Sequence, residues 1–372
     1  MKMKRFFYSG VLAASIFALL ALQVKAIGPG GLSDISGHWA KAAIQNAVAN
    51  GYVAGYPDGT FQPDAQVTRA EFIKMAVDAL KLPHSQGGTP WYQPYVSAAV
   101  EVGIHQEKDF NTDWNKPLTR MEMARIAVRA TDSTLQKPDA RLDDKSFMYR
   151  ATNNGIIQGM ENGELQPAGL STRAQAVAII ERILTVKNGG KLPVDQRAVT
   201  YAQVDIKGTN VDTLLGLQLK PFPIHLNLRK DVDVYVDKII AVDMTDPNAP
   251  YRDWFPKTIR VKDRSSADNC ILFAMHLNVI NNNDKDHSIF NYEFSVEGTN
   301  GDYQRTGIPY EYYESGKTPI HPVDSIILDT KKDSEGWYVI SVEKEKYLYN
   351  PANKIIRIYD MIHQRFINFT LE

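Results

Sequence analysis

The sequence VTRAE at residues 67–71 returns as LTRME at residues 118–122 and as STRAQ at residues 171–175. The arginines of these segments are 51 residues apart (69 to 120) and 53 residues apart (120 to 173). A second landmark has nearly the same period, because glycines recur at intervals of 52 residues, at Gly51, Gly103 and Gly155. Two landmarks with a shared period predict three tandem repeats.

Each repeat is expected to form a helix, a loop and a second helix. In the first repeat, residues 39–48 carry apolar side chains at helical spacing, and Gly51 can end that helix in the left-handed conformation. The loop GYPDGTF at residues 55–61 has the composition of turns. The second helix begins at Thr68, whose hydroxyl can cap the backbone while Glu71 reaches back. The pairs Thr119/Glu122 and Thr172/Gln175 repeat this capping box.

An arginine directly after each capping threonine is the unusual feature. A cation in the first turn of a helix faces the positive end of the helix dipole, which costs a few tenths of a kcal/mol. A guanidinium fork beside free helical amides suits a carboxylate or phosphate. We therefore expect an anionic ligand at Arg69, Arg120 and Arg173. Thr68 and Glu71 by themselves are explained equally well by helix capping.

Three features together resemble the S-layer homology (SLH) domain family: Trp39, the loop at residues 55–61 and the Thr-Arg-Ala-Glu box. Three tandem copies are usual in that family, and the resemblance covers about residues 30 to 187. It implies a pseudo-threefold prism of helices, an all-α pseudo-trimer. It also implies that grooves between the repeats bind secondary cell wall polysaccharide, often through a pyruvate ketal whose carboxylate meets the box arginine.

The resemblance assigns residues to this polysaccharide-binding role by position. The arginines would contact the ligand, the threonines and glutamates would shape the helix starts, and the tryptophans would line groove walls. These residues are Arg69, Arg120, Arg173, Thr68, Thr119, Thr172, Glu71, Glu122, Trp39 and Trp91. Tryptophan at helical spacing is also typical of a protein core.

The repeats are not equivalent. The second has QEKDF at residues 106–110 in place of the aspartate–glycine loop, and the third has Asp143 where Trp39 would align and Gln175 in place of Glu71. We therefore expect unequal grooves, with the groove of Arg69 contributing most because its repeat matches the family best.

The chain is expected to begin with an export signal at residues 1–26, because basic residues precede an apolar stretch and small residues follow it. A retained membrane anchor is the alternative, but the apolar core is about 12 residues where a spanning helix needs about 20. We expect no stable membrane insertion after cleavage. The repeats are assigned to residues 30–82, 86–132 and 138–186, a linker to residues 187–198, and a β-rich domain to residues 199–372.

Strand-like alternation dominates the C-terminal half, as at Val232, Val234 and Val236. Residues 272–280 and 289–296 are expected to form a strand, a turn and a strand. The pattern favours an antiparallel, all-β sandwich of the immunoglobulin-like kind. The predicted protein is therefore multidomain, with an all-α part followed by an all-β part.

Composition excludes several functions. The 42 basic and 43 acidic residues give a net charge of -1, so no nucleic acid partner is expected. One cysteine cannot build a disulfide or a cysteine-based metal site, and no catalytic motif is present. We expect no enzyme activity, no cofactor and no metal. Asp284 and Asp286 could ligate calcium, but their loop lacks the Asp-x-Asp-x-Asp-Gly pattern of calcium-binding loops.

The expected protein is secreted, lies at the bacterial cell wall or S-layer surface, and is anchored noncovalently to an anionic, peptidoglycan-linked secondary cell wall polysaccharide. Lattice neighbours in an S-layer are a further expected partner. One alternative is an SLH-anchored glycan-active enzyme or carbohydrate-binding protein, for which residues 199–372 would need a concave site with facing carboxylates. The other is the periplasmic face of an outer-membrane barrel, which the charged stretches at residues 331–333 and 343–346 disfavour.

Overall fold

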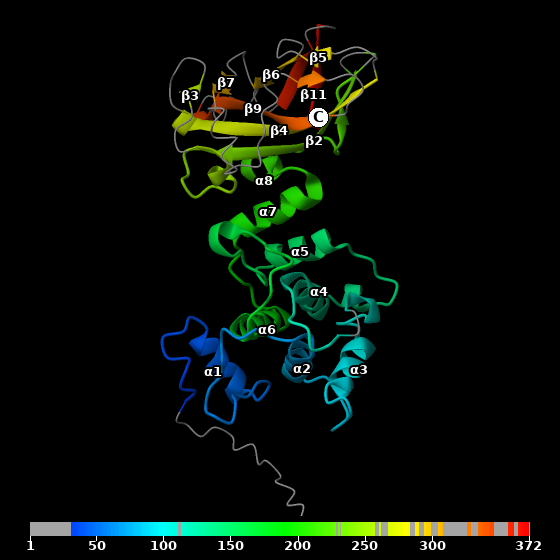
Figure 1. Ribbon diagram of the computed structural model, residues 1–372, viewed down its shortest axis with the longest axis vertical. Coiled ribbons are helices and arrows are strands. Elements are labelled where there is room, and N and C mark those ends of the chain that lie inside the picture. Colours follow the sequence, from blue (N-terminus) through cyan, green and yellow to red (C-terminus); the bar gives the residue numbers. More distant parts are fainter. Residues whose placement is uncertain are drawn as a thin grey trace, which may run out of the picture.

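The computed structural model describes residues 31–110, 113–227, 230, 232–256, 260–261, 267–282, 287–289, 294–298, 304–307, 326–328, 334–345, 356–360 and 364–371. The expected export signal at residues 1–26 and the aspartates 284 and 286 lie outside these ranges. Figure 1 shows helices gathered in one half of the molecule and strands in the other, stacked along its longest axis.

Each repeat contributes two α-helices, as predicted. They are α1 (Lys41–Ala49) and α2 (Arg69–Ala79), α3 (Gln93–Val102) and α4 (Arg120–Thr131), and α5 (Asp144–Asn153) and α6 (Arg173–Lys187). Short 3-10 turns lie between them at η1 (Glu107–Asp109), η2 (Ser133–Gln136) and η3 (Glu161–Gly163). The periodic glycines follow the first helix of each repeat with positive φ angles of 78° at Gly51, 84° at Gly103 and 70° at Gly155, which confirms their left-handed conformation.

A closed ring of backbone hydrogen bonds joins the three repeats just before their second helices. The amide of Leu118 donates to the carbonyl of Val67 (2.8 Å), that of Ser171 donates to Leu118 (2.9 Å), and that of Val67 donates to Ser171 (3.0 Å). All three residues are fully buried. The starts of α2, α4 and α6 are therefore held around one centre, which brings the three capping boxes together although they are far apart in the sequence.

The three repeats share one hydrophobic core. Residues from every repeat belong to it, including Phe61 and Phe72 from the first, Ile126 from the second, and Phe147 and Ile183 from the third. A unit of two helices cannot bury its apolar face alone, so the packing of neighbouring repeats supplies the core.

The expected linker at residues 187–198 is non-helical over residues 188–195, but the residues after it are helical, although we assigned residues 199–372 to a β-rich domain. Helix α7 (Gln196–Lys207) begins at Asp195, whose Oδ1 accepts hydrogen bonds from the amides of Arg197 and Ala198 (3.1 and 3.2 Å), and ends at the left-handed Gly208. A short helix, α8 (Val211–Leu215), follows. Ala198 and Ala202 pack in the core of the repeats, whereas Val204 packs against the sheet. Helix α7 therefore lies between the two halves, as Figure 1 shows.

The strands form an antiparallel sheet with the order β1-β2-β4-β9-β7-β3. Their bounds are β1 (Ile224–His225), β2 (Val232–Asp243), β3 (Arg260–Val261), β4 (Cys270–Asn281), β7 (Gln304–Gly307) and β9 (Ser334–Glu343). Two smaller sheets pair β6 (Phe294–Gly298), β10 (Ile356–Asp360) and β11 (Arg365–Asn368), and β5 (His287–Ile289) with β8 (Ile326–Leu328).

The expected strand at residues 272–280 is β4, and the expected strand at residues 289–296 falls on β5 and β6, with residues 290–293 outside the described ranges. Strand β4 lies between β2 and β9, with Val279 opposite Val234 and Leu277 opposite Gly336, while β5 pairs with β8. A strand that is apolar on both faces is suited to the centre of a sheet, and this position decides its neighbours.

Both faces of the large sheet are covered. On one face, Val234 and Phe273 pack with Ile356 of β10 and with Phe369. On the other, Val242 and Leu272 pack with Val204, while Tyr251 and Phe255 from the segment after β2 complete the layer. A helix and a loop cover this second face. Our prediction of an all-β part is therefore wrong, because this half of the molecule also contains helices.

Candidate functional site

The three predicted capping boxes are confirmed. The hydroxyls of Thr68, Thr119 and Thr172 each accept a hydrogen bond of 3.2 Å from the amide three residues on. In return, the side chains of Glu71, Glu122 and Gln175 accept from the threonine amides at 2.8, 2.9 and 3.0 Å. Each box satisfies two of the amides that a helix start leaves without partners.

The arginines after these caps point into the junctions between repeats. They are buried, with exposed fractions of 8% for Arg69, 8% for Arg120 and 6% for Arg173. Arg69 forms an ion pair with Glu122 of the second repeat, and Arg173 forms one with Glu71 of the first (3.3 Å). Glu71 and Glu122 therefore each cap their own helix with Oε2 and hold an arginine of another repeat with Oε1. This contact offsets the unfavourable position of a cation at a helix start.

Arg120 has different partners because the third repeat carries Gln175 where the others carry a glutamate. Its guanidinium donates to the carbonyls of Leu165 (2.8 Å) and Gln158 (2.7 Å). Burial lowers the pKa of Arg120, and the nearby charge of Arg182 lowers it further. Within the part of the chain that the structure describes, Arg120 makes no ion pair with a carboxylate.

The three repeats also differ in the partners of the residue that lies nine positions after the box arginine, on the second helix of each repeat. Arg129 on α4 forms an ion pair with Asp109, and the first repeat has Asp78, which pairs with Lys74 (2.7 Å). Arg182 on α6 donates instead to the neutral side chain of Gln158 (2.9 Å) and to the carbonyl of Ile156 (3.1 Å). The junction of the second and third repeats thus holds two arginines whose described partners are neutral.

These two arginines line a cavity of about 200 Å³. Helices α4 and α6 and residues 157–160 form most of its wall, and Trp39 of the first repeat closes one side. Trp39 is 64% exposed, so its indole is available to a ligand. The cavity therefore combines two cations, two glutamine side chains and an exposed aromatic ring, which suits an anionic group carried on a partly apolar body such as a sugar.

The structure brings together only part of the predicted set. Trp39 and Arg120 line this cavity, whereas Trp91, 48% exposed, packs its ring edge against Tyr92 and Tyr95 elsewhere on the second repeat. Arg182 was missed from the sequence. Its equivalence to Arg129, nine residues after a box arginine in both repeats, was the available signal.

Comparison with known proteins finds a family match in two of the three predicted repeats. Residues 31–73 and 140–177 match the family model of the S-layer homology domain, in the first and third repeats. No helix among the described residues is long and apolar enough to cross a membrane. No cluster of three or more metal-binding side chains lies in the described ranges.

Relatives include surface proteins and enzymes. The amylopullulanase of Thermoanaerobacterium thermosulfurigenes is 32% identical over 41% of this chain and 9% of its own length. The surface-layer 125 kDa protein of Lysinibacillus sphaericus is 31% identical over 56% of this chain and 19% of its own. The cellulosome-anchoring protein of Acetivibrio thermocellus is 52% identical over 12% of this chain and 10% of its own. The chain spans less than a fifth of the length of each of these relatives.

Proposed function

We propose that this chain anchors its strand-rich part to the cell surface by binding an anionic, peptidoglycan-linked secondary cell wall polysaccharide noncovalently. The three repeats, joined by their ring of hydrogen bonds, would form the pseudo-threefold prism of the SLH family. The matches to the SLH model and the likeness to a cellulosome-anchoring protein and to S-layer proteins support this proposal.

One observation carries the proposal: Arg120 and Arg182 line the same cavity, and their described partners are neutral. A buried cation without a carboxylate beside it is costly, and an incoming anion lowers that cost. A carboxylate such as a pyruvate ketal would fit between the two guanidinium groups, with the apolar face of its sugar on Trp39. Arg69 and Arg173 are already paired with glutamates of other repeats, so we propose that they hold the repeats together. We therefore propose that the main binding groove is at Arg120, where the sequence had favoured Arg69.

The test is sedimentation of the full chain with purified cell walls. Replacing Arg182 by Gln removes a charge-assisted contact worth about 1.5–3 kcal/mol, which corresponds to a loss of roughly 10–150-fold in affinity. Arg150→Gln is the matched control, because Arg150 lies on α5 outside the cavity and pairs with Asp132. Equal sedimentation of the Arg182→Gln and Arg150→Gln proteins would overturn the proposal.

Gln175→Glu is a sharper variant, since it installs the carboxylate found in the other two boxes. The new glutamate would keep the cap on Thr172 and pair with Arg120, as Glu122 does with Arg69. We expect wall affinity to fall by about tenfold, the effect of about 1.4 kcal/mol, while stability stays the same or rises. A gain in affinity would show that the positive charge of this cavity is not what binds the polymer.

We further propose that the strand-rich part has no catalytic activity and that neighbouring S-layer subunits are a second class of partner. The S-layer relatives support the second point. Release of reducing ends from wall glycans, measured with the full chain, would disprove the first; a strictly monomeric protein on reconstituted walls would disprove the second.

A further inference from the structure

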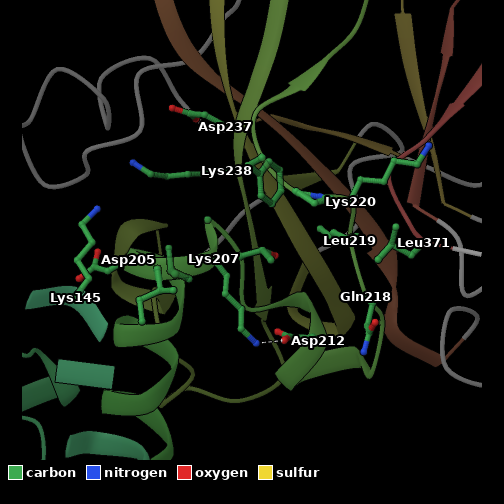
Figure 2. A pocket seen from close by; sticks show the side chains of 16 residues that line it. Lys145, Asp205, Lys207, Asp212, Gln218, Leu219, Lys220, Asp237, Lys238 and Leu371 are labelled. Atoms are coloured by element: carbon green, nitrogen blue, oxygen red, sulfur yellow. Dashed lines mark hydrogen bonds and ion pairs between the residues drawn. The ribbon is translucent and has the colours of Figure 1, made fainter. Parts of the chain in front are cut away.

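A larger cavity, of about 590 Å³, lies at the seam between the repeats and the sheet. It shares no residue with the cavity of Trp39. Its walls come from α5, the end of α7, the segment 218–222, β2 and Leu371 near the C-terminus. Figure 2 shows Lys145 and Asp205 on one side of this cleft, Asp237 and Lys238 above it, and Lys220, Leu219 and Leu371 on the other side.

Cations exceed anions in this seam cleft. Four lysines and three aspartates line it. Lys207 pairs with Asp212 (2.8 Å), and Oδ1 of Asp237 lies 2.7 Å from Nδ1 of His276. Beside the Lys207–Asp212 pair, three lysines from three separate elements, Lys145, Lys220 and Lys238, face the two carboxylates of Asp205 and Asp237. Among the described residues, none of these three lysines forms an ion pair. On a chain whose net charge is -1, this positive excess is a local feature of the cleft.

The cleft also has an apolar surface. Leu219, Pro221 and Phe222 line one wall, and two exposed apolar side chains lie at its margin, Ile206 (38%) and Leu371 (49%). Exposed apolar groups beside cations are suited to a ligand that has both an apolar face and a negative charge.

Two walls of the cleft, the end of α7 and β2, are fixed relative to each other. The amide of Ile239 on β2 donates to the carbonyl of Gly208 (2.9 Å), and the side chain of Asn210 bonds both the amide and the carbonyl of Ala241 (2.8 Å each). Gly208 has a φ of 73°, and a Cβ there would lie 2.7 Å from the carbonyl oxygen of Asp237. These two walls are therefore preformed, so binding would require little reorganisation of them.

We propose that the seam cleft binds an acidic oligosaccharide segment. A carboxylate or phosphate would lie among Lys145, Lys220 and Lys238, and the apolar face of a sugar ring would rest on Phe222 and Leu371. The choice of a glycan rests on the proposed function, because a chain held at the wall meets acidic glycans at high local concentration. Binding at this cleft would give the protein a second contact with such polymers, and two linked contacts strengthen attachment beyond either alone.

The test is calorimetric titration of the full chain with three probes: oligogalacturonate for carboxylates, oligoglycerol phosphate for phosphates, and uncharged dextran oligomers. At least one charged probe should bind and dextran should not. The double variant Lys145→Gln, Lys238→Gln should bind the charged probe at least tenfold more weakly, and the exposed Lys220→Glu should also weaken it. Lys41→Gln on α1, an exposed lysine outside both cavities, is the matched control.

Unchanged binding in the double variant, equal binding of dextran, or equal loss in Lys41→Gln would each overturn the proposal. Wall sedimentation keeps its failure distinct from that of the proposed function. If only the seam cleft is wrong, Arg182→Gln still releases the chain from walls. If the proposed function is wrong, Arg182→Gln sediments like the unaltered chain, whatever the titrations give.

Discussion

At the scale of single residues, each glutamate of the capping boxes makes two contacts, one with its own helix start and one with an arginine of another repeat. Glu122 caps α4 and pairs with the buried Arg69, so Glu122→Gln keeps the cap, as Gln175 does in its own box, and removes the charge from the pair. We expect a loss of about 3 kcal/mol in unfolding free energy, since a buried arginine loses its counter-charge. Chemical denaturation measures it. An unchanged midpoint would show that the pair is screened by water.

His105 predicts how stability depends on pH. Its imidazole is 1% exposed, and burial lowers its pKa to about 4, with Asp109 opposing this shift and Arg129 adding to it. An unfolded histidine titrates near 6.5. Between pH 6.5 and 4 the unfolded chain therefore binds the extra proton, and stability falls as pH falls. We expect His105→Gln to flatten this part of the curve of melting temperature against pH. Identical slopes in both proteins would assign the loss to other groups.

At the scale of elements, the glycines after the first helix of each repeat differ in what surrounds them. Gly51 and Gly103 have similar φ angles, 78° and 84°, but an added Cβ meets nothing within 4 Å at Gly51 and would lie 2.1 Å from the carbonyl of Gln136 at Gly103. We expect Gly51→Ala to cost about 1 kcal/mol through backbone strain alone and Gly103→Ala to cost clearly more. Melting curves of the pair check this. Equal losses of melting temperature in the two variants would mean that the backbone at Gln136, after α4, moves away from the added Cβ at little cost.

At the scale of the whole molecule, α7 belongs to both halves. Ala198 and Ala202 are fully buried against the repeats. A fragment of residues 31–187 should therefore melt several degrees below a fragment of residues 31–207, because the shorter one exposes the face that α7 covers. Both should sediment with walls, since all residues of the Trp39 cavity precede residue 183. Equal melting temperatures would show that α7 adds nothing to the repeats.

Attachment of the whole chain should weaken with salt without being abolished. Added ions screen charge attraction beyond about 8–10 Å, whereas short contacts to Arg120 and Arg182 and packing on Trp39 persist. Sedimentation at increasing sodium chloride measures this. Complete release at moderate salt would indicate attachment by diffuse charge and would contradict a shaped cavity.

The sequence alone determined the features that depend on neighbouring residues. The period of the repeats, the capping boxes at Thr68, Thr119 and Thr172, and the left-handed glycines follow from hydrogen bonds and backbone angles within a few residues. Helix α7 also carried local signals, Asp195 at its start and Gly208 at its end, but we placed the start of a β-rich domain at residue 199, inside this helix.

Only the tertiary structure decided which arginine keeps its charge uncompensated. Arg69 and Glu122 are 53 residues apart and meet because the ring of backbone bonds closes, so no local pattern distinguishes Arg69 from Arg120. The position of β4 between β2 and β9, and the cover that α7 gives to the sheet, were likewise set by which apolar faces could be buried together. Burial is a property of surfaces that meet in space, and surfaces far apart in sequence meet only once the chain has folded.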